Sequence, residues 1–184
     1  MNEDKQRNSK NNISYPRNDY SFIEKTNSQT LRETILRKNG VVYTPDKLAH
    51  YLAQKTVEYF FNDPWFQHLE KISMVDPASG DGVLLNSIAN LVCEKKFAHI
   101  TLCGVDIDNK AIQSSKKRFE GYDDRLKLVL INTNYLCPFN ELKLLTGWTR
   151  IFESAGVNDG FDILIANPPW GANLSDYKKD IDLD

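Results

Sequence analysis

The sequence lacks any long apolar run: stretches such as residues 128–131 fall far below the roughly 18 residues that a membrane-spanning helix needs. Its N-terminus carries charged and amide side chains without the apolar segment of a secretory signal, so we expect a cytoplasmic protein that does not bind membranes. Cysteine is scarce as well, with 3 residues and no C-x-x-C pair. This scarcity argues against a disulfide framework and a zinc site, and we expect buried, reduced thiols and no metal.

What is present indicates a single folded domain. Hydrophobic residues make up 41% and charged residues 26% of the 184 positions, which excludes a collagen-like or wholly disordered chain. The formal net charge is -2, but the residues up to Lys38 carry about +3 and the remainder about -5. Because nucleic acids are held mainly through Lys and Arg, we expect this chain alone to bind DNA or RNA weakly.

The pattern along the chain predicts two parts, a mobile tail over residues 1–28 and a folded part over 29–184. The tail is interpreted as a solvated leader, with a nucleic-acid-contacting arm as the alternative. A short helix is predicted over 29–38, ended by Asn39 and Gly40. An amphipathic helix then follows to Phe61, with Thr44 as its expected cap and Pro45 at its first position.

Apolar segments at 72–75, 100–105, 126–131 and 161–166 predict four strands, and helical patterns separate the first three. This alternation predicts an α/β fold: a doubly wound, mostly parallel sheet with helices on both faces. Residues 137–159 are harder to interpret, and we expect a short helix at 141–146 followed by a loop.

A glycine-rich loop, Asp76-Pro77-Ala78-Ser79-Gly80-Asp81-Gly82, follows the first strand and opens a helix. Ligands of such sheets bind beyond the carboxyl ends of the strands. The loop matches neither phosphate-binding glycine pattern, and its carboxylates favour a cationic ligand. Asp106, at the end of the second strand, is placed to accept hydrogen bonds from ribose hydroxyls. A tight turn that merely requires glycine is the structural alternative.

A second motif, Asn167-Pro168-Pro169-Trp170, follows the fourth strand. The prolines fix the backbone, so the Asn167 amide oxygen and the Pro168 carbonyl are rigid acceptors beside the flat indole of Trp170. This combination suits a planar substrate that carries an NH₂ group. A proline turn with a tryptophan in the core is the alternative.

These motifs, with Gly40-Val41-Val42-Tyr43-Thr44-Pro45 before them, resemble the N6-adenine DNA methyltransferases of bacterial restriction-modification systems in which the cofactor motifs precede the catalytic one. The resemblance runs from Gly40 to about Ser175. It implies a Rossmann-like fold, S-adenosylmethionine as cofactor, and double-stranded DNA with a flipped adenine as substrate. It implies that catalysis uses Asn167, Pro168, Pro169 and Trp170. The cofactor residues it implies are Tyr43, Thr44, Asp76, Pro77, Ala78, Gly80, Gly82, Asp106, Ile107, Asn134 and Tyr135.

The chain departs from that family in two respects. Asn134 stands where the family usually has Asp, so its amide would meet the cofactor adenine without a negative charge. The family's later strands and target-recognition region are also missing after the fourth strand, so we expect most DNA contacts to lie in a missing C-terminal part, or a protein partner to complete the sheet. RNA adenine, a protein glutamine, or cofactor binding without turnover are the alternative functions.

Overall fold

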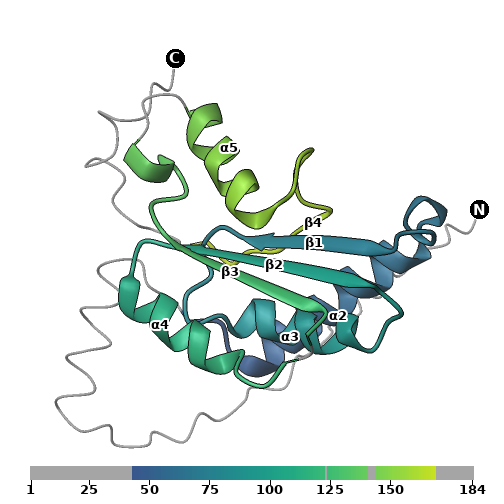
Figure 1. Ribbon diagram of the computed structural model, residues 1–184. Helices are drawn as coiled ribbons and strands as arrows, with labels where there is room; N and C mark the ends of the chain where they lie inside the picture. Colours follow the sequence, from purple (N-terminus) through teal and green to yellow (C-terminus); the bar gives the residue numbers. More distant parts are fainter. Residues whose placement is uncertain (1–42, 123, 141–143, 169–184) are drawn as a thin grey trace, which may run out of the picture.

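The computed structural model describes residues 43–122, 124–140 and 144–168. The predicted tail, the predicted helix at 29–38, and both Pro169 and Trp170 lie outside the described residues. Helices and strands alternate along this part of the chain (Figure 1). In chain order they are α2 (Asp46–Asn62), η1 (Pro64–Phe66), β1 (Lys71–Asp76), α3 (Val83–Cys93), β2 (His99–Asp106), α4 (Asn109–Arg118), β3 (Leu126–Asn132), η2 (Pro138–Asn140), α5 (Leu144–Ala155) and β4 (Ile163–Leu164).

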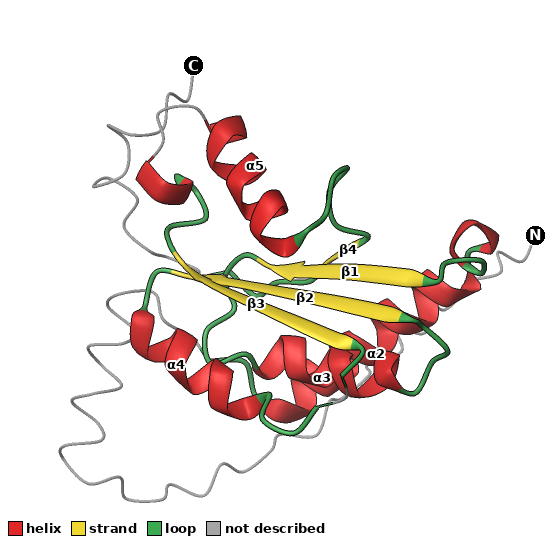
Figure 2. Cartoon of the chain, in the orientation of Figure 1, coloured by secondary structure: helices red, strands yellow, loops and turns green. Residues whose placement is uncertain are grey.

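The four strands form one parallel sheet in the order β3-β2-β1-β4. The chain builds outward from β1 to β3 and then returns to the other side of β1, so the strand order reverses between β1 and β4. Helices α2, α3 and α4 cover one face of the sheet and α5 covers the other (Figure 2). The predicted doubly wound fold is therefore confirmed.

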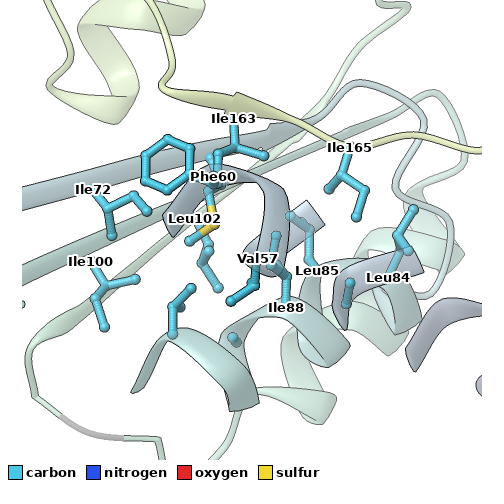
Figure 3. Close-up of a cluster of buried hydrophobic side chains, with 14 of the residues drawn as sticks. Val57, Phe60, Ile72, Leu84, Leu85, Ile88, Ile100, Leu102, Ile163 and Ile165 are labelled. Carbon is cyan, nitrogen blue, oxygen red and sulfur yellow. The ribbon is translucent and has the colours of Figure 1, made fainter. Parts of the chain in front are cut away.

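Two apolar clusters hold the layers together. The larger one packs α2 and α3 against the sheet, with Phe60, Ile72, Ile88, Leu102 and Ile163 among its buried members (Figure 3). The smaller one lies under α5, where Ile151 and Ala155 pack with residues of β1 and β2. Both faces of the inner strands are thus buried, which is the reason why their sequences are continuous apolar runs.

Three local predictions were wrong. The helix expected at 141–146 is α5, which runs from Leu144 to Ala155, because its apolar side packs on the second cluster. The fourth strand has ladder pairing only over Ile163 and Leu164, and on either side of them one backbone bond, from Asp162 to Ser73 or from Ile165 to Val75, continues the contact with β1. Thr44 does not cap α2: Pro45 occupies the N-cap position and no side-chain cap bond forms.

Asp162 anchors this short edge strand to the middle of the sheet. Its Oδ2 accepts hydrogen bonds from the backbone N–H and the hydroxyl of Ser73, both at 2.7 Å. Beyond the ladder, the Ile165 N–H donates to the Val75 carbonyl at 3.0 Å. These bonds fix where the chain leaves the sheet toward Asn167. In the ranges that the structure describes, no helix is long and apolar enough to cross a membrane.

Candidate active site

The carboxyl ends of all four strands lie along one edge of the sheet, because the strands are parallel. Asp106 pairs in register with Asn132 of β3, so Asn134 follows two residues beyond that pair. On the other side, Ile165 bonds to Val75 near the end of β1, so Asn167 follows two residues beyond that bond. The sheet therefore orders the predicted site residues as Asn134, Asp106, the loop and Asn167.

The glycine-rich loop is tied directly to the end of β2. Gly80 N–H donates to Asp106 Oδ2 at 2.7 Å, and Ser79 N–H donates to the Val105 carbonyl at 2.9 Å. The other carboxylate oxygen of Asp106 accepts the Asp108 N–H at 2.8 Å. Since a carboxylate offers about four acceptor positions, two remain for further donors. The structure thus brings together the two motifs that the sequence placed at separate strand ends.

Gly80 and Gly82 adopt the left-handed conformation that this turn requires, with φ of +53° and +79°. No atom lies within 4 Å of the position that a Gly80 side chain would occupy, so the loop backbone faces open space there. At Gly82, by contrast, a side chain would collide with the hydroxyl of Ser115 in α4. One glycine leaves room for a ligand and the other allows helix packing.

The Asp76 carboxyl is almost completely buried, with 1% of the residue exposed. Its Oδ1 accepts the Ala78 N–H at 3.0 Å. Burial raises the pKa of this carboxyl to about 7; the Ala78 N–H opposes the rise and the nearby charge of Asp106 adds to it. A cation that entered this site would stabilise the ionised form of Asp76.

Asp81 has a different role from the one expected. We expected both loop carboxylates to favour a cationic ligand, but Arg118 of α4 holds Asp81: its Nη2 lies 2.5 Å from Asp81 Oδ2 and its Nε donates to the Asp81 carbonyl at 3.0 Å. This pairing neutralises Asp81 and fastens the loop to α4. Nothing in the sequence pattern indicated Arg118, because it lies 37 positions further along the chain.

The residues that follow β3 form a tightly bonded turn. Asn134 Oδ1 accepts the Leu136 N–H at 3.0 Å, while Tyr135 packs against the cluster under α5. Asn132 was not among the predicted site residues; its Nδ2 donates to the carbonyls of Asp106 and Ile107, both at 2.9 Å. A polar amide at the end of a buried strand is the signal that would have found it. Ile107 itself is 59% exposed.

Asn167 meets the segment before α2 at the other end of the edge. Its Nδ2 donates to Thr44 Oγ1 at 3.0 Å, although the two residues lie 123 positions apart. Pro168 is half-buried, whereas Tyr43 is 50% exposed. The contact joins the predicted N-terminal cofactor motif to the predicted catalytic motif. Among the described residues, no group of three or more His, Cys, Asp or Glu side chains could hold a metal ion.

No family model matches the sequence. The chain is 28% identical over 146 residues to the type II methyltransferase M.BanIII of Aneurinibacillus aneurinilyticus, a match covering 77% of this chain and 24% of that protein. It is 24% identical over 161 residues to the modification methylase CviBIII of Paramecium bursaria Chlorella virus NC1A, covering 88% and 34%. The chain thus spans about a quarter to a third of the length of these curated relatives.

Two solved structures share the fold. One, described as a class I S-adenosylmethionine-dependent methyltransferase of Listeria monocytogenes, has a TM-score of 0.52 at 20% identity and covers 84% of this chain and 42% of that one. The other, from a cryoEM structure of a DrdV–DNA complex, has a TM-score of 0.50 at 15% identity and covers 85% and 17%. The described part of the chain therefore has the fold of S-adenosylmethionine-dependent methyltransferases, and the similarity to DNA methyltransferases expected from the sequence is found with type II DNA methyltransferases.

Proposed function

We propose that this chain is the cofactor-binding and catalytic part of a cytoplasmic DNA methyltransferase of a restriction-modification system, which transfers a methyl group from S-adenosylmethionine to adenine N6. One observation carries the proposal: the order of the predicted site residues along the sheet edge. Asn134, Asp106, the loop and Asn167 follow one another in the order of the adenine, the ribose, the methionine end and the methyl acceptor. If these residues served only in turns and core packing, they would not need to lie along the sheet edge in this order.

The residues at the edge also fit the cofactor chemically. The two acceptor positions left on Asp106 match two vicinal ribose hydroxyls. The open space beside Gly80 admits the nucleoside close to the loop backbone, and the buried Asp76 supplies negative charge for a cationic ligand. Tyr43, Ile107 and Tyr135 would add apolar surface, and Pro77, Ala78 and Gly82 the shape of the loop. Bound S-adenosylmethionine would supply an electrophilic methyl group.

Asn167 and Pro168 would activate the methyl acceptor. The lone pair of an adenine amine is delocalised into the ring, so the amine becomes nucleophilic when acceptors bind its hydrogens and favour a tetrahedral nitrogen. The Asn167 amide oxygen and the Pro168 carbonyl are acceptors of this kind. Trp170 would stack on the ring, and Pro169 would hold the turn. Base pairing hides N6 in a duplex, so the adenine must be flipped out at a cost of a few kcal/mol.

DNA is the favoured substrate because the relatives are a type II methyltransferase and a modification methylase. RNA adenine and a protein glutamine also present an NH₂ group and are the competing substrates. The short strand β4 leaves its outer side without a described neighbour, and Leu164 there is 65% exposed. We propose that further polypeptide of this protein, or a protein partner, covers this edge and provides most of the DNA contacts.

Two measurements test the proposal. Calorimetric titration of the chain with S-adenosylmethionine should show saturable binding, and Asp106→Asn should weaken it. A radiolabelled methyl-transfer assay with duplex DNA, RNA and a glutamine-containing protein should label adenine in DNA. It is run with this chain alone and with the full-length protein that its gene encodes. Asn167→Ala should abolish labelling with little change in cofactor affinity, whereas Asn158→Ala, an exposed amide outside the site, should change neither. Absence of cofactor binding would refute the proposal. Labelling of RNA alone or of protein alone would mean that this molecule, and not DNA, is the substrate.

A further inference from the structure

The hydroxyl of Thr44 is not used by the helix that follows it. A threonine just before a helix usually accepts a hydrogen bond from a backbone N–H of the first turn. Here α2 starts at Asp46, Pro45 is the N-cap residue, and no side-chain cap bond forms. The helix instead begins with the backbone bond from the Ala49 N–H to the Pro45 carbonyl at 2.9 Å. The Thr44 side chain is therefore available to a distant part of the chain.

That distant part is Asn167, whose backbone is held by few sheet bonds. The β4 ladder covers only two residues, and the bond from Ile165 to Val75 is the last described backbone bond between this segment and β1. Pro168, which follows, has no N–H to donate. An asparagine side chain has two rotatable bonds and two chemically different ends, so the hydrogen bonds of its amide decide which end faces which side.

We propose that Thr44 is a positioning residue that orients the Asn167 amide for the methyl acceptor. Asn167 Nδ2 donates to Thr44 Oγ1, so the Oδ1 end of the same amide points away from Thr44. The amide thus presents a donor to the protein and an acceptor in the other direction, which is the polarity needed to bind a hydrogen of an NH₂ group. This inference rests on the proposed function, and it gives Thr44 a role in place of the cofactor contact that the family resemblance implies.

The structure offers a closely matched set of variants. Thr44→Val keeps the shape of the side chain and removes the hydroxyl, and Thr44→Ser keeps the hydroxyl. Thr56→Val is the control, because the Thr56 hydroxyl is also half-buried but donates to the Leu52 carbonyl inside α2, at 2.8 Å. If any threonine-to-valine change near α2 lowered activity, both Thr44→Val and Thr56→Val would lower it. If the Asn167 amide lost its orientation, only Thr44→Val would show the effect.

The first test needs no turnover. In ¹⁵N-labelled full chain, the side-chain amide signal of Asn167 is assigned by its disappearance in Asn167→Asp. Thr44→Val should shift this signal and speed its hydrogen exchange, whereas Thr44→Ser and Thr56→Val should leave both nearly unchanged. An Asn167 amide signal that does not respond to Thr44→Val would overturn the proposal, whether or not the chain methylates DNA.

The second test uses the methyl-transfer assay on the full-length protein that its gene encodes. Thr44→Val should lower kcat between roughly tenfold and a hundredfold while the Kd of S-adenosylmethionine stays the same within about twofold. Thr44→Ser should restore most of kcat. If Thr44→Val weakens cofactor binding and leaves kcat intact, Thr44 acts on the cofactor and the proposal is wrong. Wild-type protein that binds no cofactor would instead contradict the proposed function, and the amide signal would still decide the role of Thr44.

Discussion

The backbone N–H of Gly80 donates a 2.7 Å hydrogen bond to the side chain of Asp106, which lies at the end of the neighbouring strand. The loop after β1 therefore holds the Asp106 carboxylate at the end of β2 in place. The loop and this carboxylate form one unit of the candidate cofactor site. Arg118 of α4 holds the same loop through Asp81, and Ser115 of α4 lies close to Gly82. Changes in α4 are thus expected to reach the site through the loop.

Gly82→Ala should destabilise the protein strongly, because the new methyl group combines left-handed strain with a collision. The φ of Gly82 is +79°, and a Cβ there would lie well inside van der Waals contact with Ser115 Oγ. We expect a loss of about 2 to 4 kcal/mol in the free energy of unfolding, measured by urea denaturation.

Gly121→Ala separates the two causes. Gly121 has a φ of +86° but no atom within 4 Å of its Cβ position, so only strain applies and the loss should be about 1 kcal/mol. Adding Ser115→Ala to Gly82→Ala should recover part of the stability that Gly82→Ala loses in excess of Gly121→Ala. Equal losses at the two glycines would show that the collision is relieved without cost.

Asp76 makes stability depend on pH. Burial raises the pKa of its carboxyl from 3.8 to about 7, so the folded protein retains a proton that the unfolded chain has released. Its contribution to stability is complete below about pH 4 and is lost as the pH rises toward and through 7. Each pKa unit corresponds to about 1.4 kcal/mol, so the loss amounts to at most about 4 kcal/mol.

Asp76→Asn should remove this dependence while retaining an acceptor for the Ala78 N–H. Urea unfolding at pH 4.5 and pH 8 should show that the variant gains stability relative to wild type at the higher pH. Asp124→Asn removes a charge at an exposed turn and serves as the control. A wild-type protein whose stability relative to Asp76→Asn is the same at both pH values would contradict a raised pKa.

Asp162→Ala should loosen β4. The change removes two hydrogen bonds from Ser73 to a charged acceptor, and we expect a loss of about 1 to 3 kcal/mol in unfolding free energy. Hydrogen exchange should also accelerate at the Ile165 amide, which bonds to Val75 beyond the ladder. Ser73→Ala removes the bond from the hydroxyl to Asp162 Oδ2 and the 3.2 Å bond that the hydroxyl accepts from the Asp162 N–H. The Ser73 N–H still donates to Asp162 and the Asp162 N–H still donates to the Ser73 carbonyl, so the effect on both measurements should be smaller. Unchanged exchange at Ile165 would mean that the apolar contacts of β4 suffice.

Arg118→Met should release the glycine-rich loop without unfolding the protein. The Arg118–Asp81 pair is about one third exposed, so its loss should cost less than about 1 kcal/mol. Hydrogen exchange at the Gly82 amide, which bonds to the Ser79 carbonyl, should nevertheless increase. Lys117→Met, the same kind of change one residue earlier, should leave that exchange rate unchanged. Equal rates in the two variants would show that α4 holds the loop by packing alone.

The sequence predicted those features that depend on local pattern. The apolar runs of β1 and β2 are buried on both faces and that of β3 is largely half-buried, so their positions and the α/β fold could be recognised from hydrophobicity alone. The loop after β1 could be recognised because left-handed turns favour glycine, whose conformation is a property of the single residue. Helix α5 was placed too early and too short, because packing on the second cluster sets its extent.

Only the tertiary structure decided which residues meet. The pairing of Asp81 with Arg118 removed a carboxylate that the sequence had assigned to a cationic ligand, and the diversion of the Thr44 hydroxyl to Asn167 removed an expected helix cap. Both partners lie tens of residues away, so no local pattern records them. A strand or a turn follows from the preferences of neighbouring residues, whereas a side-chain contact depends on how the whole sheet brings its strand ends together.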